Sequence, residues 1–255
     1  FRDGWGKDSA YLLVNLRFTG WHRYKATGTV TLVYQSGILS ADALDGKPFS
    51  WLPVGRSLFR DKRVPRENLN GLVVEKTGMA AVLYGLTGIG GSWAQDPPYY
   101  AEVVAFETGP ERDWAHIQLV DWRGWQHDRW IYFYHNGGPI VILDEARGPA
   151  RAKAGLIWHL VGGEEVAAGH FRLRGGDATV EIALLPLFSD GAEVQERNAG
   201  SLYLDVVHWC VSELYEVAAL VHGKWTGAEM ETSEREIILK SGLEERISFT
   251  LPFGE

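Results

Sequence analysis

Apolar and polar side chains alternate along most of the chain with a period of two, the pattern of half-buried β-strands. The alternation is clear in residues 11–18 (YLLVNLRF) and in residues 100–107 (YAEVVAFE). It recurs in about fifteen short runs separated by turn residues, a spacing that favours a large sandwich over alternating strands and helices. The predicted strands are residues 11–18, 29–34, 72–75, 80–84, 100–107, 114–122, 129–134, 139–145, 155–160, 170–173, 179–185, 201–208, 214–222, 235–239 and 246–251.

Turn signals separate these runs. Residues 136–139 (Asn-Gly-Gly-Pro) and residues 175–177 (Gly-Gly-Asp) are typical of hairpin connections. Residues 213–221 have a composition that a helix would tolerate, but the run is short and its flanks resemble strands. The sequence therefore predicts an all-β fold: one large two-layer antiparallel β-sandwich over residues 1–255, with very little helix.

One long segment lacks the alternation. Residues 43–70 contain three prolines and a dense basic cluster, and the cluster itself, residues 56–67, includes only two acidic residues. A long irregular segment in a compact domain is usually functional or disordered, and the interleaved Trp51, Leu58 and Phe59 favour an ordered loop. The basic residues of this arginine-rich loop are Arg56, Arg60, Lys62, Arg63 and Arg66.

A polar turn precedes that loop. Residues 20–28 (GWHRYKATG) follow the first predicted strand and place four hydrogen-bonding or ionisable side chains in one turn. These side chains are His22, Arg23, Tyr24 and Lys25, and Asp42 follows them after the next strand.

Charge and hydropathy exclude two classes of partner. The net charge of −8 argues against nucleic acid, because neutralising phosphates needs a basic face. No apolar run approaches the roughly 20 residues of a membrane span, so no membrane partner is expected. The single cysteine, Cys210, is expected to be a buried, inert thiol. Because the chain begins at Phe1 with sequence typical of the middle of a domain, we expect it to be a fragment.

Aromatic residues are abundant, with 11 Trp, 10 Tyr and 10 Phe. Such side chains suit wide pleated faces in a core and also surfaces that hold flat ligands. Residues 121–128 (DWRGWQHD) place Trp122 and Trp125 on either side of a glycine. This turn is either an edge on which a sugar stacks or a structural turn whose rings cover the core.

The order of these elements resembles the C-terminal β-sandwich of the heparinase II/III-like polysaccharide lyases. Residues 4–12 (GWGKDSAYL) resemble the strand that opens that sandwich, and a turn containing His22 follows it. Gly37, Asp42 and the arginine-rich residues 56–74 come in the order of the family's next elements. The further matching segments are residues 129–132 (RWIY) with residues 141–144 (VILD), and residues 157–160 (IWHL).

The resemblance implies a larger enzyme. In this family a helical α/α toroid precedes the sandwich, and substrate lies in the cleft between the two domains. The implied activity is β-elimination on a uronic acid-containing polysaccharide, outside the cytoplasm, in a secreted or periplasmic protein. The implied partners are the acidic polysaccharide and the upstream helical domain. Without that domain the isolated sandwich is expected to be inactive.

The family's metal site is incomplete in this chain. The family turn carries two histidines and an aspartate that help to bind a metal, and a later histidine completes the site. Here His22 is kept, but the second histidine position falls on Tyr24 or Lys25, and the later one falls within residues 68–70, which contain no histidine. Zinc takes three or four ligands, so His22 and Asp42 alone would form only a degenerate site, and no cofactor is expected.

Elimination requires a neutralised carboxylate, a base and an acid. Arg23, Lys25 or an arginine of the loop could neutralise the uronate carboxylate. Tyr24 or His22 could transfer the proton, since histidine titrates near neutral pH. We therefore expect His22, Tyr24 and Lys25 as catalytic residues. The expected substrate-binding residues are Arg23, Arg56, Arg60, Arg63, Arg66, Trp122 and Trp125.

Two other functions fit the same residues. The chain could be a non-catalytic module that binds glycan through the arginine-rich loop and aromatic side chains. It could also be a structural sandwich that supports a neighbouring domain, with the loop in that interface and the polar turn merely solvated.

Overall fold

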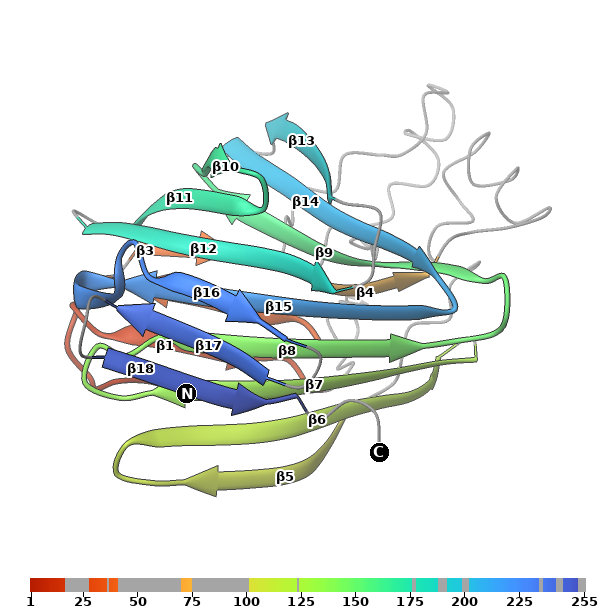
Figure 1. Cartoon of the computed structure of the whole chain (residues 1–255), viewed down its shortest axis with the longest axis horizontal. Coiled ribbons are helices and arrows are strands. Elements are labelled where there is room, and N and C mark those ends of the chain that lie inside the picture. Colours follow the sequence, from red (N-terminus) through yellow and green to blue (C-terminus); the bar gives the residue numbers. More distant parts are fainter. Residues whose placement is uncertain are drawn as a thin grey trace, which may run out of the picture.

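The computed structural model describes residues 1–16, 28–35, 37–40, 70–74, 101–122, 124–175, 178–187, 192–198, 202–233, 236–241 and 245–251. These residues are almost entirely antiparallel strands, and their only helical element is the short 3-10 turn η2 (Gly223–Trp225). The predicted all-β sandwich is confirmed (Figure 1).

The first sheet has the strand order β1-β2-β3-β9-β14-β13, and β4 also pairs with β9. All of its pairings are antiparallel. Its strands are β1 (Ala10–Val14), β2 (Val30–Tyr34), β3 (Gly37–Ser40), β4 (Gly71–Val74), β9 (Lys153–Val161), β13 (Ala192–Asn198) and β14 (Leu202–Val211).

The second sheet has the strand order β10-β11-β12-β15-β8-β7-β6-β5. Its central strands β8 and β15 are buried along nearly their whole length, which means that both of their faces are covered. Its strands are β5 (Glu102–Thr108), β6 (Arg112–Trp122), β7 (Trp125–Tyr134), β8 (Ile140–Arg147), β10 (Glu164–Ala167), β11 (His170–Gly175), β12 (Ala178–Leu187) and β15 (Glu213–His222).

A small third sheet covers the outer face of the second. It consists of β16 (Glu229–Thr232), β17 (Glu236–Ser241) and β18 (Glu245–Thr250). Ile237, Leu239 and Phe249 from this sheet pack against Val141 and Val217 of the second sheet. Figure 1 shows the three strands lying over β15 and β8. The sandwich therefore carries a third layer over the middle of one face, in addition to the two layers predicted.

The main core lies between the first and second sheets. Alternate residues of each strand point inward, such as Ile131 and Phe133 on β7, and they meet Trp158 and Leu160 of β9. A smaller apolar cluster that includes Trp125 and Leu156 fills another part of the same interior. Along β7, the inward positions between Trp125 and Ile131 are polar, and this polar layer leads to the candidate site.

Candidate functional site

The third strand of the first sheet is interrupted. Strands β3 and β4 both pair with β9, because Ser40 is opposite Leu160 and Gly71 is opposite Ile157. They therefore lie end to end along one side of β9. Residues 41–69, which include the arginine-rich loop, lie outside the described residues, so the described chain stops at one side of this break and resumes at the other.

Asn70 fills the break. Its side-chain Oδ1 accepts a hydrogen bond from the backbone N–H of His159 at 2.7 Å. Its Nδ2 donates to the Val30 carbonyl at 3.0 Å and to the Ser40 hydroxyl at 2.9 Å. The Ser40 hydroxyl in turn donates to the His159 carbonyl at 3.0 Å. Asn70 is fully buried, so its amide takes the place of a peptide group in the ladder between β2 and β9.

The polar turn joins the sheet beside this break. Gly28 and Asn15 close its base, with the Gly28 N–H donating to the Asn15 carbonyl at 2.7 Å. The Asn15 N–H donates to the Thr29 carbonyl at 3.0 Å, and the Asn15 side chain donates to the Thr29 hydroxyl at 3.2 Å. Val30, which contacts Asn70, lies two residues beyond Gly28. The described residues that flank segments 17–27 and 41–69 are therefore neighbours.

A third segment returns to the same place. The Ala101 N–H donates to the Leu16 carbonyl at 2.7 Å, so residues 75–100 end beside the start of residues 17–27. The flanks of three long segments therefore meet at one end of β1 and β2.

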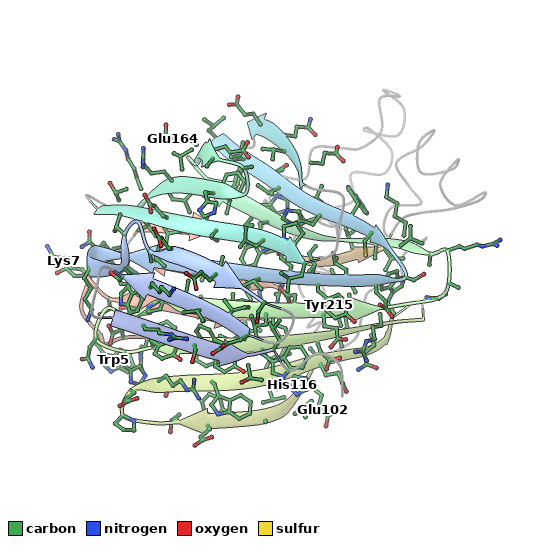
Figure 2. All side chains as sticks on the ribbon, viewed as in Figure 1. Trp5, Lys7, Glu102, His116, Glu164 and Tyr215 are labelled. Atoms are coloured by element: carbon green, nitrogen blue, oxygen red, sulfur yellow. The ribbon has the colours of Figure 1, made fainter. Side chains whose placement is uncertain are left out.

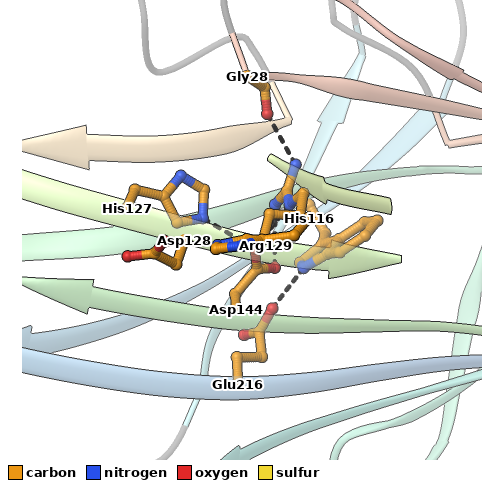
Figure 3. Close-up of polar contacts among 8 residues, drawn as sticks. Gly28, His116, His127, Asp128, Arg129, Asp144 and Glu216 are labelled. Atoms are coloured by element: carbon orange, nitrogen blue, oxygen red, sulfur yellow. Dashed lines mark hydrogen bonds and ion pairs between the residues drawn. The ribbon is translucent and has the colours of Figure 1, made fainter. Parts of the chain in front are cut away.

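A buried ion pair holds the base of the polar turn from inside the sandwich. Arg129 on β7 contacts both carboxylate oxygens of Asp144 on β8, with Nε–Oδ1 at 2.6 Å and Nη2–Oδ2 at 3.0 Å. Its remaining Nη1 donates to the Gly28 carbonyl at 2.8 Å. His127 Nε2 is 2.8 Å from Asp144 Oδ1. Figure 3 shows the guanidinium between Asp144 and Gly28.

The Asp144 carboxylate stays ionised in this interior. Burial alone would raise its pKa, but the charge of Arg129 and the hydrogen bond from His127 outweigh burial and lower the pKa below its usual value. Arg129 is 2% exposed and Asp144 0%, so water does not screen the pair. Arg129 is thus fixed by two bonds to Asp144 and presents its third donor to Gly28, whose φ of 76° suits glycine.

The polar layer continues to the first sheet. Trp158 Nε1 on β9 donates to Glu216 Oε1 on β15 at 2.5 Å, and His208 Nδ1 on β14 contacts the other oxygen of Glu216. The Arg129 guanidinium lies 5.8 Å from the centre of the Trp158 ring. All four side chains are buried, so the two sheets are tied together beneath Gly28, where the polar turn ends.

His159 lies opposite the strand break. Its Nδ1 is 2.7 Å from Asp205 Oδ1, its cross-strand neighbour on β14, and its ring meets Tyr203 edge-on with centroids 6.5 Å apart. A carboxylate in this position fixes the orientation of the imidazole, as in many acid–base sites. His159 lies within the sheet at 1% exposure, and its backbone N–H bonds to Asn70.

Most of the predicted site residues lie outside the described residues. This holds for His22, Arg23, Tyr24, Lys25, Asp42, Arg56, Arg60, Arg63 and Arg66. We expect these residues to lie at one rim of the sandwich, because the described residues that flank their segments meet there. Within the described ranges no group of three or more His, Cys, Asp or Glu side chains is arranged to hold a metal ion, and the degenerate pair His22 and Asp42 lies outside them.

Of the two tryptophans of the predicted sugar-stacking edge, the structure describes the side chain of Trp125. Trp122 ends β6, and its side chain lies outside the described part of the chain. Trp125 is 0% exposed in the smaller apolar cluster, and its ring packs so closely on Gly148 that a Cβ there would come within 2.2 Å of it. The buried position of Trp125 thus fits the second interpretation of residues 121–128, a structural turn whose rings cover the core.

Sequence reasoning missed Asn70 and Gly28, and it treated Arg129 and Asp144 only as parts of a family-like hairpin. A signal for the ion pair was present. Arg129 lies seven residues before Asn136 and Asp144 seven after Gly137, so a hairpin centred on that turn pairs them, as observed. A charged side chain at an inward position of an apolar strand is costly to bury unless an opposite charge on the neighbouring strand pairs with it.

No family model matches the chain, and no curated protein matches it. Solved structures do match. A crystal structure of the heparan sulfate lyase HepC from Pedobacter heparinus shares 13% identity at a TM-score of 0.70, over 100% of this chain and 41% of that one. A heparinase III gene product shares 14% identity at a TM-score of 0.69, over 98% of this chain and 40% of that one. A further heparinase III shares 12% identity at a TM-score of 0.67, over 98% of this chain and 41% of that one.

At these identities the likeness establishes the fold. The chain spans about two fifths of the length of the lyases it matches. Among the described residues no helix has the length and apolar character needed to cross a membrane.

Proposed function

We propose that this chain is the C-terminal β-sandwich of a heparinase II/III-like polysaccharide lyase, which cleaves a uronic acid-containing polysaccharide by β-elimination together with an upstream helical domain. The observation that carries the proposal is the fold match over 98–100% of this chain to two fifths of a heparinase III and of the heparan sulfate lyase HepC. A secreted or periplasmic location follows from such a substrate.

The geometry of the first sheet supports a site at the strand break. The described residues that flank the polar turn and the arginine-rich loop are joined through Asn70 and Val30. A protein of net charge −8 needs a local basic surface to hold an acidic polymer, and the loop supplies Arg56, Arg60, Arg63 and Arg66 within 11 positions. The proposed surface is therefore the outer side of this break.

Each residue of the polar turn has a role in the proposal. Arg23 or Lys25 neutralises the uronate carboxylate, which acidifies the neighbouring C–H. Tyr24 or His22 removes that proton and returns one to the departing glycosidic oxygen. The buried Arg129 and Asp144 hold the Gly28 carbonyl, and thus the end of the turn, without touching substrate.

The test uses the parent protein with its upstream domain. Heparan sulfate, chondroitin sulfate, hyaluronan and alginate are supplied in turn, and the ultraviolet absorbance of the unsaturated uronate product is followed. We expect product from at least one polymer, and a loss of at least about a hundredfold in kcat for Tyr24→Phe or His22→Ala, since proton transfer contributes that much. The matched control Arg174→Ala, on the exposed side of β11, should retain activity.

A folded parent protein that yields no unsaturated product from any of these polymers would overturn the lyase proposal. One observation favours a second candidate, a non-catalytic glycan-binding module: the family's second histidine position holds Tyr24 or Lys25 here. Binding of heparan sulfate without product, weakened by Arg60→Ala with Arg63→Ala, would support that second function.

A further inference from the structure

A cavity of about 350 Å³ lies at the opposite end of β1 and β2 from the strand break. This volume falls within the roughly 300–1,000 Å³ of small-molecule sites. Its polar lining comes from four separate parts of the chain: the N-terminal segment, the end of β2, the β7–β8 turn and the end of β15. The polar side chains are those of Asp3, Asp8, Tyr34, Asn136, His222 and Lys224.

One wall of the cavity is held rigidly by Asp3. Its Oδ1 accepts the Asn136 N–H at 3.0 Å, and its Oδ2 accepts the Gly137 N–H at 2.9 Å. Asn136 and Gly137 have φ values of 54° and 72°, which direct both N–H groups toward the carboxylate. Because each carboxylate oxygen has a second lone pair, Asp3 keeps acceptor capacity for a ligand.

His222 belongs to the lining of the cavity and is 3% exposed. Its Nε2 is buried from solvent and has no hydrogen-bond partner among the described residues, so this nitrogen faces the interior and not the open cavity. Burial lowers the pKa of His222, so at neutral pH its ring is uncharged.

Tyr34 adds an aromatic face and a donor beside the same ring. Its ring centroid is 4.3 Å from that of His222, at 35°. Burial, with the charges of Asp8 and Asp3, raises the pKa of Tyr34, so its hydroxyl stays protonated. Tyr34 lines the same cavity as Asp3 and Asp8.

The lining combines the carboxylate acceptors of Asp3 and Asp8, the ammonium donor of Lys224, and the Tyr34 hydroxyl, which can donate or accept. Sugar hydroxyls donate and accept at once, and their C–H faces pack on aromatic rings, so a saccharide satisfies such a wall better than an apolar molecule does. Two carboxylates against one ammonium make the wall net acidic, which repels uronate and sulfate groups. The described residues show no three-ligand metal group here.

We propose that this cavity binds a neutral monosaccharide unit, at a site separate from the strand break. The site does not depend on the lyase proposal, since none of its residues belongs to the polar turn or the arginine-rich loop.

The test is a titration of the full protein with glucose, galactose and mannose, followed by calorimetry and by the NMR signals of the His222 ring. We expect saturable binding of at least one sugar, with the His222 ring protons shifting at the same concentration. Because Asp8 is exposed and Tyr34→Phe keeps the ring, Asp8→Asn and Tyr34→Phe should fold and should each weaken binding by about tenfold.

The controls separate this site from other causes. Glu102→Gln removes an exposed carboxylate on β5, which Figure 2 shows well away from Lys7, the chain neighbour of the cavity residue Asp8, and it should leave affinity unchanged. Glucuronate should bind at least about tenfold more weakly than the neutral sugar. No saturable binding of any of the three sugars, equal binding of glucuronate, or affinity unaltered by both Asp8→Asn and Tyr34→Phe would overturn the proposal.

Discussion

Arg129 contacts both carboxylate oxygens of Asp144 inside the sandwich, at 2.6 and 3.0 Å, and gives its remaining donor to the carbonyl of Gly28. The pair links the second sheet to the base of the polar turn on the first. Loss of Asp144 therefore leaves the Arg129 charge buried without its partner, and loss of Arg129 leaves the Asp144 charge buried and also releases the Gly28 carbonyl.

We expect Asp144→Ala to lower the free energy of unfolding by about 3–5 kcal/mol, because the Arg129 charge would remain buried without a partner. Urea unfolding followed by circular dichroism measures the change. Such a loss is a large part of a domain's total stability of about 5–15 kcal/mol. A loss under about 1 kcal/mol would contradict the dry interior that the structure shows.

Two companion variants sharpen this result. The double variant Arg129→Met with Asp144→Leu should recover much of the lost stability, because apolar groups of similar volume replace the whole pair. Arg172→Ala removes an ion pair to Glu164 whose partners are 46% and 67% exposed, and it should cost at most about 1 kcal/mol.

Asn70 is expected to be as sensitive as a core residue although it is polar. Asn70→Ala removes the acceptor of the His159 N–H and the donor to the Val30 carbonyl, both buried. An orphaned buried group costs about 1–3 kcal/mol, so the variant should lose about 3 kcal/mol of unfolding free energy. Hydrogen exchange of the His159 amide should accelerate, while Gln195→Ala on the exposed side of β13 should change neither quantity.

The strand architecture was predictable because its signal is local. Predicted residues 129–134 and 139–145 correspond to β7 and β8, and 214–222 to β15. The edge strands β10 and β13 were missed, because their residues are mostly polar and exposed. β5 is also mostly exposed, but it was predicted because Val103, Val104 and Phe106 give it an apolar pattern that β10 and β13 lack.

The candidate site was predictable only in part because its contacts are long-range. Asn70 bonds to Val30 and His159 across 40 and 89 positions of sequence, and Arg129 bonds to Gly28 across 101. No local pattern encodes such separations. The third sheet was missed for a similar reason: alternation in residues 235–239 predicts a strand but does not reveal which face it covers.

Cys210 is expected to react slowly. Burial raises the pKa of its thiol to about 11, although the side chain is only partly buried and contacts the Glu213 carbonyl. The reactive thiolate is therefore about one thiol in a thousand at pH 8. Alkylation by iodoacetamide, followed by mass spectrometry, should be on the order of a hundredfold slower in folded protein than in urea. Equal rates would show that the thiol is solvated, and the single cysteine makes the assignment unambiguous.

His222 should make the fold sensitive to mild acid. Burial lowers its pKa below the ordinary 6.5, so on acidification the unfolded chain takes up a proton before the folded protein does. The contribution of this residue to stability is therefore complete above pH 6.5 and is lost as the pH falls from there toward the folded pKa. His222→Phe keeps an aromatic ring against Tyr34 but cannot titrate, so its unfolding free energy should fall less between pH 7 and pH 5 than that of the native protein. An NMR titration midpoint of the His222 ring at or above 6.5 would contradict this account, and with it the buried, uncharged imidazole in the lining of the cavity.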